Sequence, residues 1–349
     1  FLVGGATGMI GDPKPDAERQ LKTTEEVFAN VEKIKKQAED FFTGTEITFV
    51  NNYDWFENVK LLDFLRDIGK HFTVNDLIKK DAIATRLNSD TGLSYTEFAY
   101  PLIQGYDYYQ LFQSHNCTVQ VGGSDQWGNM ISGVELIRRK LQKEAHVLTA
   151  PLVVDKTTGK KFGKSEGNAV WLSAEKTSPY QFYQFWLNVS DDNVVDYLKL
   201  FTLLTIENIS ELSFEVESNP GARRAQKALA FEVTKLVHGE SEALSSEKVS
   251  NILFGGGDII DLEEGELKTI IENAPFSKVK EGDLVVDVLI ESNLAKSKRE
   301  ARTFIESGAV SINNNKISSI EAVVDKEGSN GGVSVLRRGK KNLSVIEIE

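Results

Sequence analysis

The chain has 349 residues, of which 40% are hydrophobic and 26% are charged, a composition typical of a globular protein with two or three domains. The formal net charge of −12 excludes wholesale nucleic-acid binding, although residues 290–349 carry 10 Lys/Arg against 8 Asp/Glu, and the rest carry 30 against 44. The apolar runs have only strand length, which excludes a membrane span, and the single Cys117 excludes an internal disulfide and fits a reducing cytosol.

Residues 1–176 alternate strand-like and helix-like segments, which predicts an α/β domain with a mostly parallel sheet and helices on both faces. The chain begins directly in a strand-like segment, Phe1-Leu2-Val3, without an initiator methionine, so we expect the sequence to be a fragment. The clearest predicted strands are 47–50, 118–121 and 151–154, and the clearest helices are 59–68 and 131–141.

From Ser178 onward the pattern is purely helical to about residue 274, with Ser178 as the expected N-cap and Pro179 in the first turn. Gly255-Gly256-Gly257 and the acidic residues that follow predict a flexible joint. A small α+β unit then begins near Gly282. Its expected elements are a segment at 284–294, a basic helix from 297 and a hairpin at 310–317.

Ser94 and Glu97 have the spacing of a capping box at the start of a helix. Tyr100, Gln104 and Asp107 follow at i, i+4 and i+7, which places them on one helix face. A proline at position 101 predicts either a kink or the true start of this helix. A buried aspartate needs a polar partner, and the alternative is that this face is solvated.

Residues 120–129, Gln-Val-Gly-Gly-Ser-Asp-Gln-Trp-Gly-Asn, are the most informative segment. Gly122 and Gly123 allow a ligand to approach the backbone, while Asp125 and Gln126 offer an acceptor and an amide. The segment 160–165, Lys-Lys-Phe-Gly-Lys-Ser, follows and is rich in cations that suit phosphates. The alternative interpretation of residues 160–165 is an ordinary turn exposed to solvent. Together the two segments predict an enzyme that activates a small molecule with a nucleotide.

At these residues the sequence resembles bacterial-type tyrosyl-tRNA synthetases, which are class I aminoacyl-tRNA synthetases, nearly from end to end. The resemblance implies a Rossmann-like catalytic domain at 1–176, a helical anticodon-region domain at 177–275, a linker at 276–281 and a ribosomal-protein-like RNA-binding module at 282–349. It also implies a cytoplasmic homodimer that uses L-tyrosine, ATP with Mg²⁺ and tRNA(Tyr), with no tightly bound cofactor, no protein-ligated metal and no membrane partner.

The resemblance assigns a role to each matching residue of the tyrosine site. Tyr100 and Gln104, with Asp12 after the glycine-rich turn 4–11, would hold the α-amino group of tyrosine. Asp107 would accept a hydrogen bond from the phenolic hydroxyl and so select tyrosine over phenylalanine. Without the resemblance, the turn before Asp12 is equally compatible with a simple strand–turn connection.

The nucleotide side of the site follows in the same way. Asp125 would accept from the ribose hydroxyls, Gly123 would bring backbone close to the ribose, and Gln126 would bind the amino acid's carboxylate. Gln120 would support them from the preceding strand. Lys161, Lys164 and Ser165 match the family's Lys-Met-Ser-Lys-Ser motif and would stabilise the departing pyrophosphate. Arg19 corresponds weakly to a basic residue near the triphosphate or the tRNA end.

One family motif is missing. Class I synthetases need a His-x-Gly-His-like element, and His71, His115, His146 and His238 do not form one. We therefore expect the opening strand and helix of the domain to be absent from this sequence, and the chain as given to activate tyrosine weakly or not at all.

The C-terminal unit supplies the expected RNA contacts. Basic residues gather on its predicted helix and near the end of the chain, and phosphate contacts are their implied role: Lys296, Lys298, Arg299, Arg302, Arg337 and Arg338. A basic helix that serves only solubility is the alternative. Two other functions stay open at this point, a tryptophanyl-tRNA synthetase with the same fold and an RNA-binding relative without catalysis.

Overall fold

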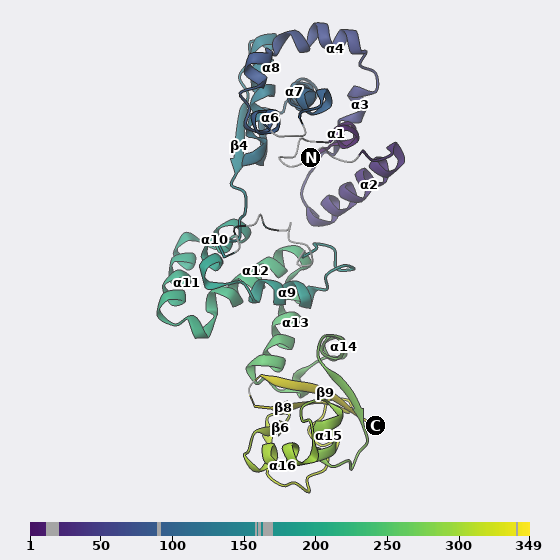
Figure 1. Cartoon of the computed structure of the whole chain (residues 1–349), viewed down its shortest axis with the longest axis vertical. Coiled ribbons are helices and arrows are strands. Elements are labelled where there is room, and N and C mark those ends of the chain that lie inside the picture. The colour runs from purple at the N-terminus through teal and green to yellow at the C-terminus, as the bar shows by residue number, and fades with distance from the viewer. Residues whose placement is uncertain (12–20, 89–91, 158, 160–161, 163–169, 340) are drawn as a thin grey trace. The chain divides into compact units, whose positions relative to one another are not determined.

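The computed structural model describes residues 1–11, 21–88, 92–157, 159, 162, 170–339 and 341–349. Contacts divide the chain into two compact units, residues 1–154 and 155–349 (Figure 1). The domain predicted from the sequence extends further along the chain than the first unit, to residue 176 instead of residue 154. Within the second unit, Phe162 stacks on Trp186 with ring centroids 5.5 Å apart, which is why this segment belongs with the helices that follow it. Every described helix is too short or too polar to cross a bilayer.

The strands of the first unit are parallel, as expected for an α/β domain, but in the described residues they form two separate two-stranded sheets and not the single sheet predicted. β1 (Leu2–Val3) pairs with β2 (Val50–Asn51), and β3 (Val119–Gly123) pairs with β4 (His146–Ala150). The strand predicted at 151–154 is wrong, because the strand ends at Ala150. Pro151 has no N–H to continue the ladder, which explains the early end.

Helices make up most of the first unit, and two of them form its core. Tyr108 on α7 is fully buried, as is Ile137 on α8. A Cβ on Gly133 would lie 2.6 Å from the Cβ of Tyr108, so glycine lets the two helices approach closely. The helices of this unit are α1 (Gly5–Ile10), α2 (Thr24–Phe41), α3 (Tyr53–Phe56), α4 (Leu61–Asp67), α5 (Val74–Leu77), α6 (Asp81–Leu87), α7 (Tyr95–His115) and α8 (Trp127–Leu141), with 3-10 turns η1 (Gly69–His71) and η2 (Ser124–Gln126).

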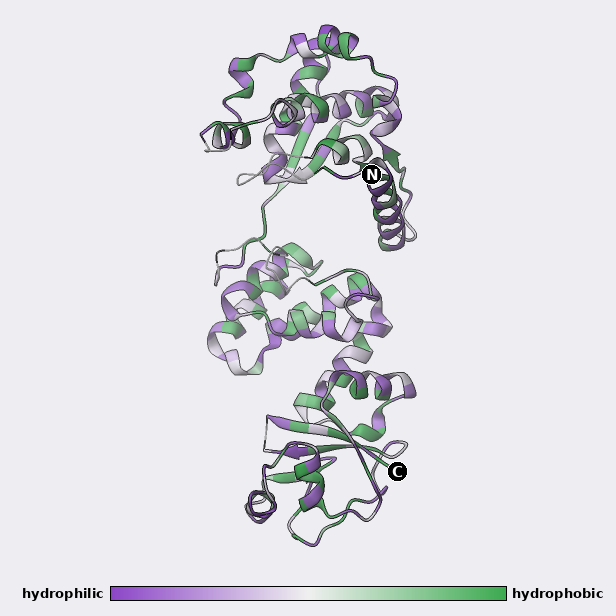
Figure 2. Cartoon of the chain, turned by 45° about the vertical axis from the view of Figure 1, so that its right-hand side comes forward, coloured by the Kyte–Doolittle hydropathy of each residue, from purple (hydrophilic) through white to green (hydrophobic). Residues whose placement is uncertain are grey.

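The second unit begins with helices that alternate hydrophobic and hydrophilic residues along their length (Figure 2). The predicted N-cap is confirmed, because the Ser178 side chain accepts from the backbone of Gln181 and Pro179 starts the helix. A helix in this unit ends at His238, where the C-cap Gly239 adopts a φ of 93°. The helices are α9 (Pro179–Leu187), α10 (Asp191–Phe201), α11 (Ile206–Ser218), α12 (Arg224–His238), α13 (Glu240–Ser250) and α14 (Glu264–Asn273), with the turns η3 (Pro220–Ala222), η4 (Asn251–Gly255, π-helical) and η5 (Ile259–Asp261).

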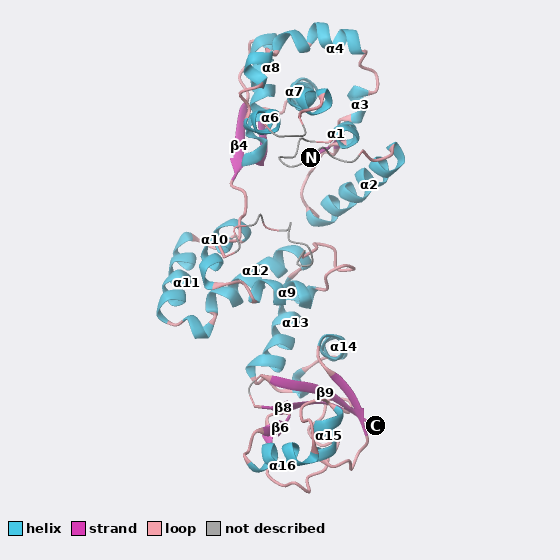
Figure 3. Ribbon diagram, in the orientation of Figure 1, coloured by secondary structure: helices cyan, strands magenta, loops and turns pink. Residues whose placement is uncertain are grey.

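A five-stranded sheet with the order β5-β9-β8-β6-β7 closes the second unit (Figure 3). The predicted linker at 276–281 contains β5, whose backbone pairs in parallel with β9. The predicted hairpin is confirmed, with Asn313 and Asn314 at φ 46° and 67° in its turn. The elements are β5 (Phe276–Val279), α15 (Val285–Glu291), α16 (Lys298–Glu306), β6 (Val310–Ile312), β7 (Asn315–Lys316), β8 (Val333–Arg338) and β9 (Asn342–Ile348).

The glycines predicted to be a flexible joint have a different role in the structure. Gly255 ends η4, and the carbonyls of Gly256 and Gly257 each accept a hydrogen bond of 3.0 Å from Asn314. Three glycines in sequence predict a backbone free to move, and in the structure the carbonyls of two of them have a defined hydrogen-bond donor.

Candidate active site and RNA-binding surface

Asp107 lies at the centre of the candidate site, on α7. Ser94 and Glu97 form the predicted capping box, so the helix starts at Tyr95 and Pro101 lies inside it, not at its start. The Asp107 side chain is only 2% exposed, so the alternative of a solvated helix face is wrong. Its carboxylate accepts hydrogen bonds from Trp55 Nε1 at 2.9 Å and from Asn52 Nδ2 at 3.1 Å.

Burial raises the pKa of Asp107 to about 7, although the hydrogen bonds from Asn52 and Trp55 oppose the shift. The carboxyl therefore changes its charge near neutral pH. A group of this kind offers an acceptor that a ligand hydroxyl can satisfy, and it penalises a ligand that leaves it unpaired.

Asn52 connects this carboxylate to the first helix of the chain. Its Nδ2 also donates to Thr7 Oγ1 at 3.1 Å, and its Oδ1 accepts from the Ala6 backbone at 2.7 Å. The neighbouring Asn51 accepts from the Gly5 backbone at 3.1 Å, and a Cβ on Gly5 would lie 2.3 Å from that oxygen. The end of β2 and the start of α1 are thus held together by two asparagine side chains and a required glycine.

Sequence reasoning did not identify Asn52 or Trp55 as site residues. The available signal was their position directly after the predicted strand at 47–50, because ligands bind at the carboxyl ends of parallel strands. Trp55 lies on α3 and was not singled out, since a tryptophan beside Tyr53 and Phe56 resembles an ordinary core residue.

Tyr100 and Gln104 share α7 with Asp107, as predicted. Tyr100 is 9% exposed and Gln104 is partly buried. At 1.5 Å per residue, Tyr100 and Asp107 are separated by roughly 10 Å along the helix axis. That separation is comparable to the length of one amino acid, so the face can contact both ends of such a ligand. Asp12, the third expected ligand of the amino group, lies outside the described residues.

The segment after β3 forms a short 3-10 turn that leads into α8. Asp125 is exposed and Gln126 is partly buried, and Asn129 Nδ2 donates to Gln126 Oε1 at 3.4 Å. A Cβ on Gly123 would come within 2.7 Å of Asp125 Oδ1, whereas one on Gly122 would meet Met130 Sδ at 3.2 Å. Gly123 therefore makes room for the Asp125 carboxylate, and Gly122 makes room for the core of α8.

Two further polar groups surround this turn. Gln120 Oε1 is buried and has no hydrogen-bond partner among the described residues. Lys80 Nζ donates to the Gly128 carbonyl at 2.5 Å, and Ser132 Oγ donates to the same oxygen at 3.1 Å. Burial lowers the pKa of the Lys80 ammonium. Sequence reasoning missed Lys80, which lies 48 residues before its partner.

Several predicted residues fall outside the described part of the chain, namely Asp12, Arg19, Lys161, Lys164 and Ser165. The described Phe162, between the two lysines, packs in an aromatic cluster of the second unit. Its ring centroid lies 5.7 Å from that of Phe185 and 5.6 Å from that of Tyr197. In the described ranges, no three His, Cys, Asp or Glu side chains are grouped to hold a metal ion.

The predicted RNA-binding residues fall into two groups. Lys298, Arg299 and Arg302 are exposed on α16, and Lys296 is exposed just before the helix, not on it as predicted. Lys298 Nζ pairs with Asp287 Oδ1 at 2.6 Å.

Arg337 and Arg338 instead direct their guanidinium groups to the protein. Arg337 donates to the Leu253 carbonyl at 2.7 Å, and Arg338 donates to the Leu294 carbonyl at 2.7 Å. The Arg338 guanidinium also lies 4.8 Å from the ring centroid of Phe304. In the sequence, Arg337 and Arg338 stand close to other basic residues, which suggests phosphate binding. That pattern does not reveal that both arginines donate to backbone carbonyls of the protein.

Comparison with known proteins identifies the family. Residues 1–255 match the family described as tRNA synthetases class I (W and Y), and residues 266–346 match the C-terminal domain described as Tyrosine–tRNA ligase SYY-like. The chain is 50% identical over 353 aligned residues to the tyrosine–tRNA ligase of Lactococcus lactis subsp. lactis strain IL1403, covering 99% of this chain and 84% of that protein. The chain belongs to the tyrosine–tRNA ligase family of class I tRNA synthetases.

Other relatives agree with this membership. The tyrosine–tRNA ligase of Streptococcus suis strain 98HAH33 is 48% identical over 99% of this chain and 84% of its own length. A C-terminally truncated mitochondrial tyrosyl-tRNA synthetase from Aspergillus nidulans superposes with a TM-score of 0.61 at 32% identity, over 73% of this chain and 76% of that one. The resemblance found in the sequence is thereby confirmed, together with the α/β class I fold and its C-terminal module.

Proposed function

We propose that the protein activates L-tyrosine with ATP to form tyrosyl-adenylate and pyrophosphate, and then transfers tyrosine to the 3′ end of tRNA(Tyr). The observation that carries the tyrosine assignment is the buried Asp107, whose carboxylate is held by Asn52 and Trp55. Phenylalanine would leave this carboxylate with only its hydrogen bonds from Asn52 and Trp55, and the complex would lack the bond that the phenolic hydroxyl of tyrosine donates.

The remaining roles extend this proposal along α7 and into the turn after β3. Tyr100 and Gln104, with Asp12, bind the α-amino group, and Gln126 binds the carboxylate. Asp125 accepts from the ribose, beside the Gly123 backbone. The pair of Asn52 and Trp55 fixes the Asp107 carboxylate before the substrate arrives, so little reorganisation is needed on binding.

Catalysis of the adenylation step then needs positioning and charge stabilisation by this chain. The carboxylate of tyrosine attacks the α-phosphorus of ATP in line, the bond to the β-phosphate oxygen breaks, and pyrophosphate leaves with the bonding electrons. We propose that Lys161, Lys164 and Ser165 stabilise the charge on that pyrophosphate, with Mg²⁺ accompanying the nucleotide. This step uses no protein nucleophile.

We propose three parts for the whole reaction: catalysis at residues 1–176, a helical tRNA-binding part at 177–275 and an RNA-binding module at 282–349. In the module, the exposed Lys296, Lys298, Arg299 and Arg302 are the proposed phosphate contacts, and Arg19 contacts the tRNA end or the triphosphate. The site of action is the cytoplasm, where tRNA is charged.

We also propose a homodimer that forms through the first unit. Support comes from apolar side chains that α4, α5 and the start of α7 leave exposed, among them Leu61 at 71%, Leu62 at 77%, Val74 at 60% and Tyr95 at 72%. Pairing with a second copy would remove these apolar side chains from water, which favours association. A second copy of the chain is the proposed occupant.

Amino-acid-dependent ATP–pyrophosphate exchange tests the function on the full natural chain. Tyrosine should support exchange, whereas tryptophan, phenylalanine or no amino acid should not. Asp107→Asn should abolish most of the preference for tyrosine, because its amide places a donor against Asn52 or Trp55. Asp40→Asn, an exposed aspartate at the end of α2, is the control and should leave exchange unchanged. Exchange with tryptophan would assign the sister activity, and no exchange at all would favour an RNA-binding relative without catalysis.

A further inference from the structure

The chain that leads into the lysine-rich segment 160–165 is held by one buried side chain, Asn193 on α10. Asn193 is 4% exposed, and its Oδ1 accepts a hydrogen bond from the Lys156 backbone at 2.8 Å. Its Nδ2 lies 3.0 Å from Asp155 Oδ1 and 3.4 Å from Thr157 Oγ1. A single amide thus contacts three consecutive residues shortly before the lysines, and burial strengthens these bonds because water competes less for them.

The three residues belong to a turn with a defined shape. The Thr157 backbone donates to Asp155 Oδ1 at 2.8 Å, and the Gly159 backbone donates to the Asp155 carbonyl at 2.7 Å. Gly159 has a φ of 68°, which glycine adopts at no steric cost. On the surface, Lys156 Nζ pairs with Asp196 Oδ2 of α10 at 2.6 Å. The turn is therefore attached to α10 by a buried amide and by an exposed ion pair.

Phe162 supplies a second contact with the same helix. Its ring centroid lies 5.6 Å from that of Tyr197 and 5.7 Å from that of Phe201, both on α10. Trp186 on α9 stacks against it with an angle of 20° between the ring planes. Aromatic pairs of this kind contribute more than their buried area alone.

The amide and the two rings lie on one face of α10, since Asn193, Tyr197 and Phe201 follow at i, i+4 and i+8. At 1.5 Å per residue, the face extends about 12 Å from Asn193 to Phe201 along the helix axis. Its first part binds the chain before Lys161, and its last part binds the chain after it. We refer to Asn193, Tyr197 and Phe201 as the α10 seat.

We propose that Asn193 is a positioning residue for the adenylation step, because the α10 seat restricts the chain on both sides of Lys161. The inference rests on the proposed function, in which Lys161 and Lys164 stabilise the departing pyrophosphate. A chain that is already restricted at its base loses less conformational freedom when its lysines bind phosphates. Asn193 acts through these contacts with the chain and not on a substrate.

The kinetic consequence differs for the two substrates of adenylation. The proposed contacts with tyrosine belong to the first unit, whereas the proposed contacts with pyrophosphate follow the turn that Asn193 holds. A small misplacement of a charged group lowers the rate of a step that depends on positioning. Loss of the contact should therefore slow the step that uses ATP and leave the binding of tyrosine alone unchanged.

Asn193→Asp in the full natural chain tests the proposal, because it keeps the acceptor for Lys156 but sets a carboxylate against that of Asp155. We expect kcat/KM for ATP in tyrosine-dependent exchange to fall about tenfold to a hundredfold, with an unchanged Kd for tyrosine. Adding Asp155→Asn to this variant restores a donor between the two side chains. The double variant should recover most of the exchange activity.

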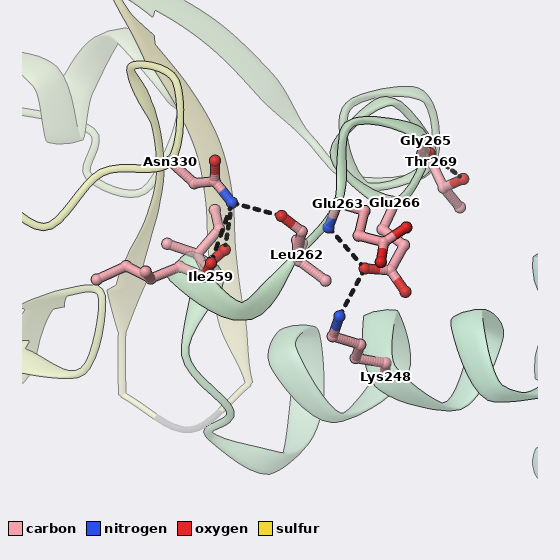
Figure 4. A network of polar contacts seen from close by, with 9 residues as sticks. Lys248, Ile259, Leu262, Glu263, Gly265, Glu266, Thr269 and Asn330 are labelled. Carbon is pink, nitrogen blue, oxygen red and sulfur yellow. Dashed lines mark hydrogen bonds and ion pairs between the residues drawn. The ribbon is translucent and has the colours of Figure 1, made fainter.

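Asn330→Asp is the matched control. Asn330 also binds backbone with its amide, and donates to the Leu262 carbonyl at 2.7 Å and to the Ile259 carbonyl at 3.0 Å (Figure 4). These contacts lie in a different part of the second unit. The same change of charge there should leave both the exchange and the Kd for tyrosine as in the parent protein.

Phe162 provides a second test that does not depend on the Asn193 variant. Phe162→Met keeps an apolar side chain that packs well against aromatic rings, and it should retain exchange. Phe162→Ser should lose exchange to an extent similar to Asn193→Asp, again without a change in the Kd for tyrosine. Equal exchange in the two Phe162 variants would show that the rings of the α10 seat do not position the segment.

Three results would overturn the role of Asn193. These are full exchange in Asn193→Asp, an equal loss of tyrosine affinity in that variant, and a failure of Asp155→Asn to restore exchange. Absence of tyrosine-dependent exchange in the parent protein would instead refute the proposed function.

Discussion

Two ion pairs in this protein illustrate how differently its two proposed substrate regions are built. Arg86 and Glu97 pair between α6 and α7, with side chains 2% and 4% exposed and two hydrogen bonds of 3.0 and 3.2 Å. Lys298 and Asp287 pair in the proposed RNA-binding module, with side chains 63% and 36% exposed. The first pair joins α6 to the start of the helix that carries Asp107, whereas the second leaves a cation exposed on the surface that we propose to contact RNA.

The polar residues around Asp107 and those along α16 also differ in burial and in how many defined partners they have. Around Asp107 a few buried groups each have defined partners, so each contributes to specificity and its removal is costly. Along α16 several exposed charges act together and are screened by salt, so each contributes little. Substitutions should therefore have large, salt-independent effects in the first region and small, salt-dependent effects in the second.

The largest expected effect is on stability. Burial raises the pKa of Glu97, but the hydrogen bonds from Arg86 and Ser94 outweigh it and hold the pKa below its usual value. Arg86→Met leaves this carboxylate buried without its cation, so the free energy of unfolding should fall by about 3–5 kcal/mol. Lys298→Met should cost less than about 1 kcal/mol. Urea unfolding of both variants measures the difference, and equal losses would contradict the comparison.

A second substitution removes a partner of Asp107. Asn52→Ala deletes a donor to a buried carboxylate, so we expect the dissociation constant for tyrosine to rise by about tenfold to a hundredfold. Equilibrium dialysis with labelled tyrosine gives the constant. Asn58→Ala is the control, because among the described residues the exposed Asn58 amide donates only to Glu57. The affinity of this variant for tyrosine should equal that of the parent protein. A similar loss in both variants would show that Asn52 acts through general stability.

The pH dependence of tyrosine binding is the next effect in size. Because burial raises the pKa of Asp107 to about 7, its carboxyl becomes protonated as the pH falls through that value. The affinity for tyrosine should then decrease about tenfold between pH 8 and pH 6. For folding the sign is opposite, since a raised carboxyl pKa favours the folded state at low pH and this contribution is lost as the pH rises towards 7. A flat binding profile in the parent, identical to that of Asp107→Asn, would exclude ionised Asp107 as the acceptor.

The smallest effect belongs to α16. Arg299→Gln should raise the KM for tRNA about twofold to threefold and lower the slope of log affinity against log salt by roughly one. Lys33→Gln, an exposed lysine of α2 in the first unit, serves as the control. A large effect of Arg299→Gln that did not depend on salt would place this residue in a buried contact and remove the contrast between the two regions.

Local signals in the sequence were sufficient for many elements. The capping box at Ser94, the N-cap at Ser178, the hairpin at 310–317 and the family resemblance follow from residues that are close together in the chain. These patterns act over three or four residues, through backbone geometry and nearby hydrogen bonds, so tertiary context changes them little.

Tertiary structure decided what depends on distant partners. The sequence identified Asp107 as a candidate, but its hydrogen-bond partners Asn52 and Trp55 lie 55 and 52 positions away in the chain. Burial in the fold raises the pKa of Asp107, and these two bonds lower it in part. In the same way, composition gives no sign that Gly256 and Gly257 have a hydrogen-bond donor, whereas in the fold Asn314 donates to both of their carbonyls. A sequence states which groups can form hydrogen bonds, whereas only the fold determines which of them lose water and find each other.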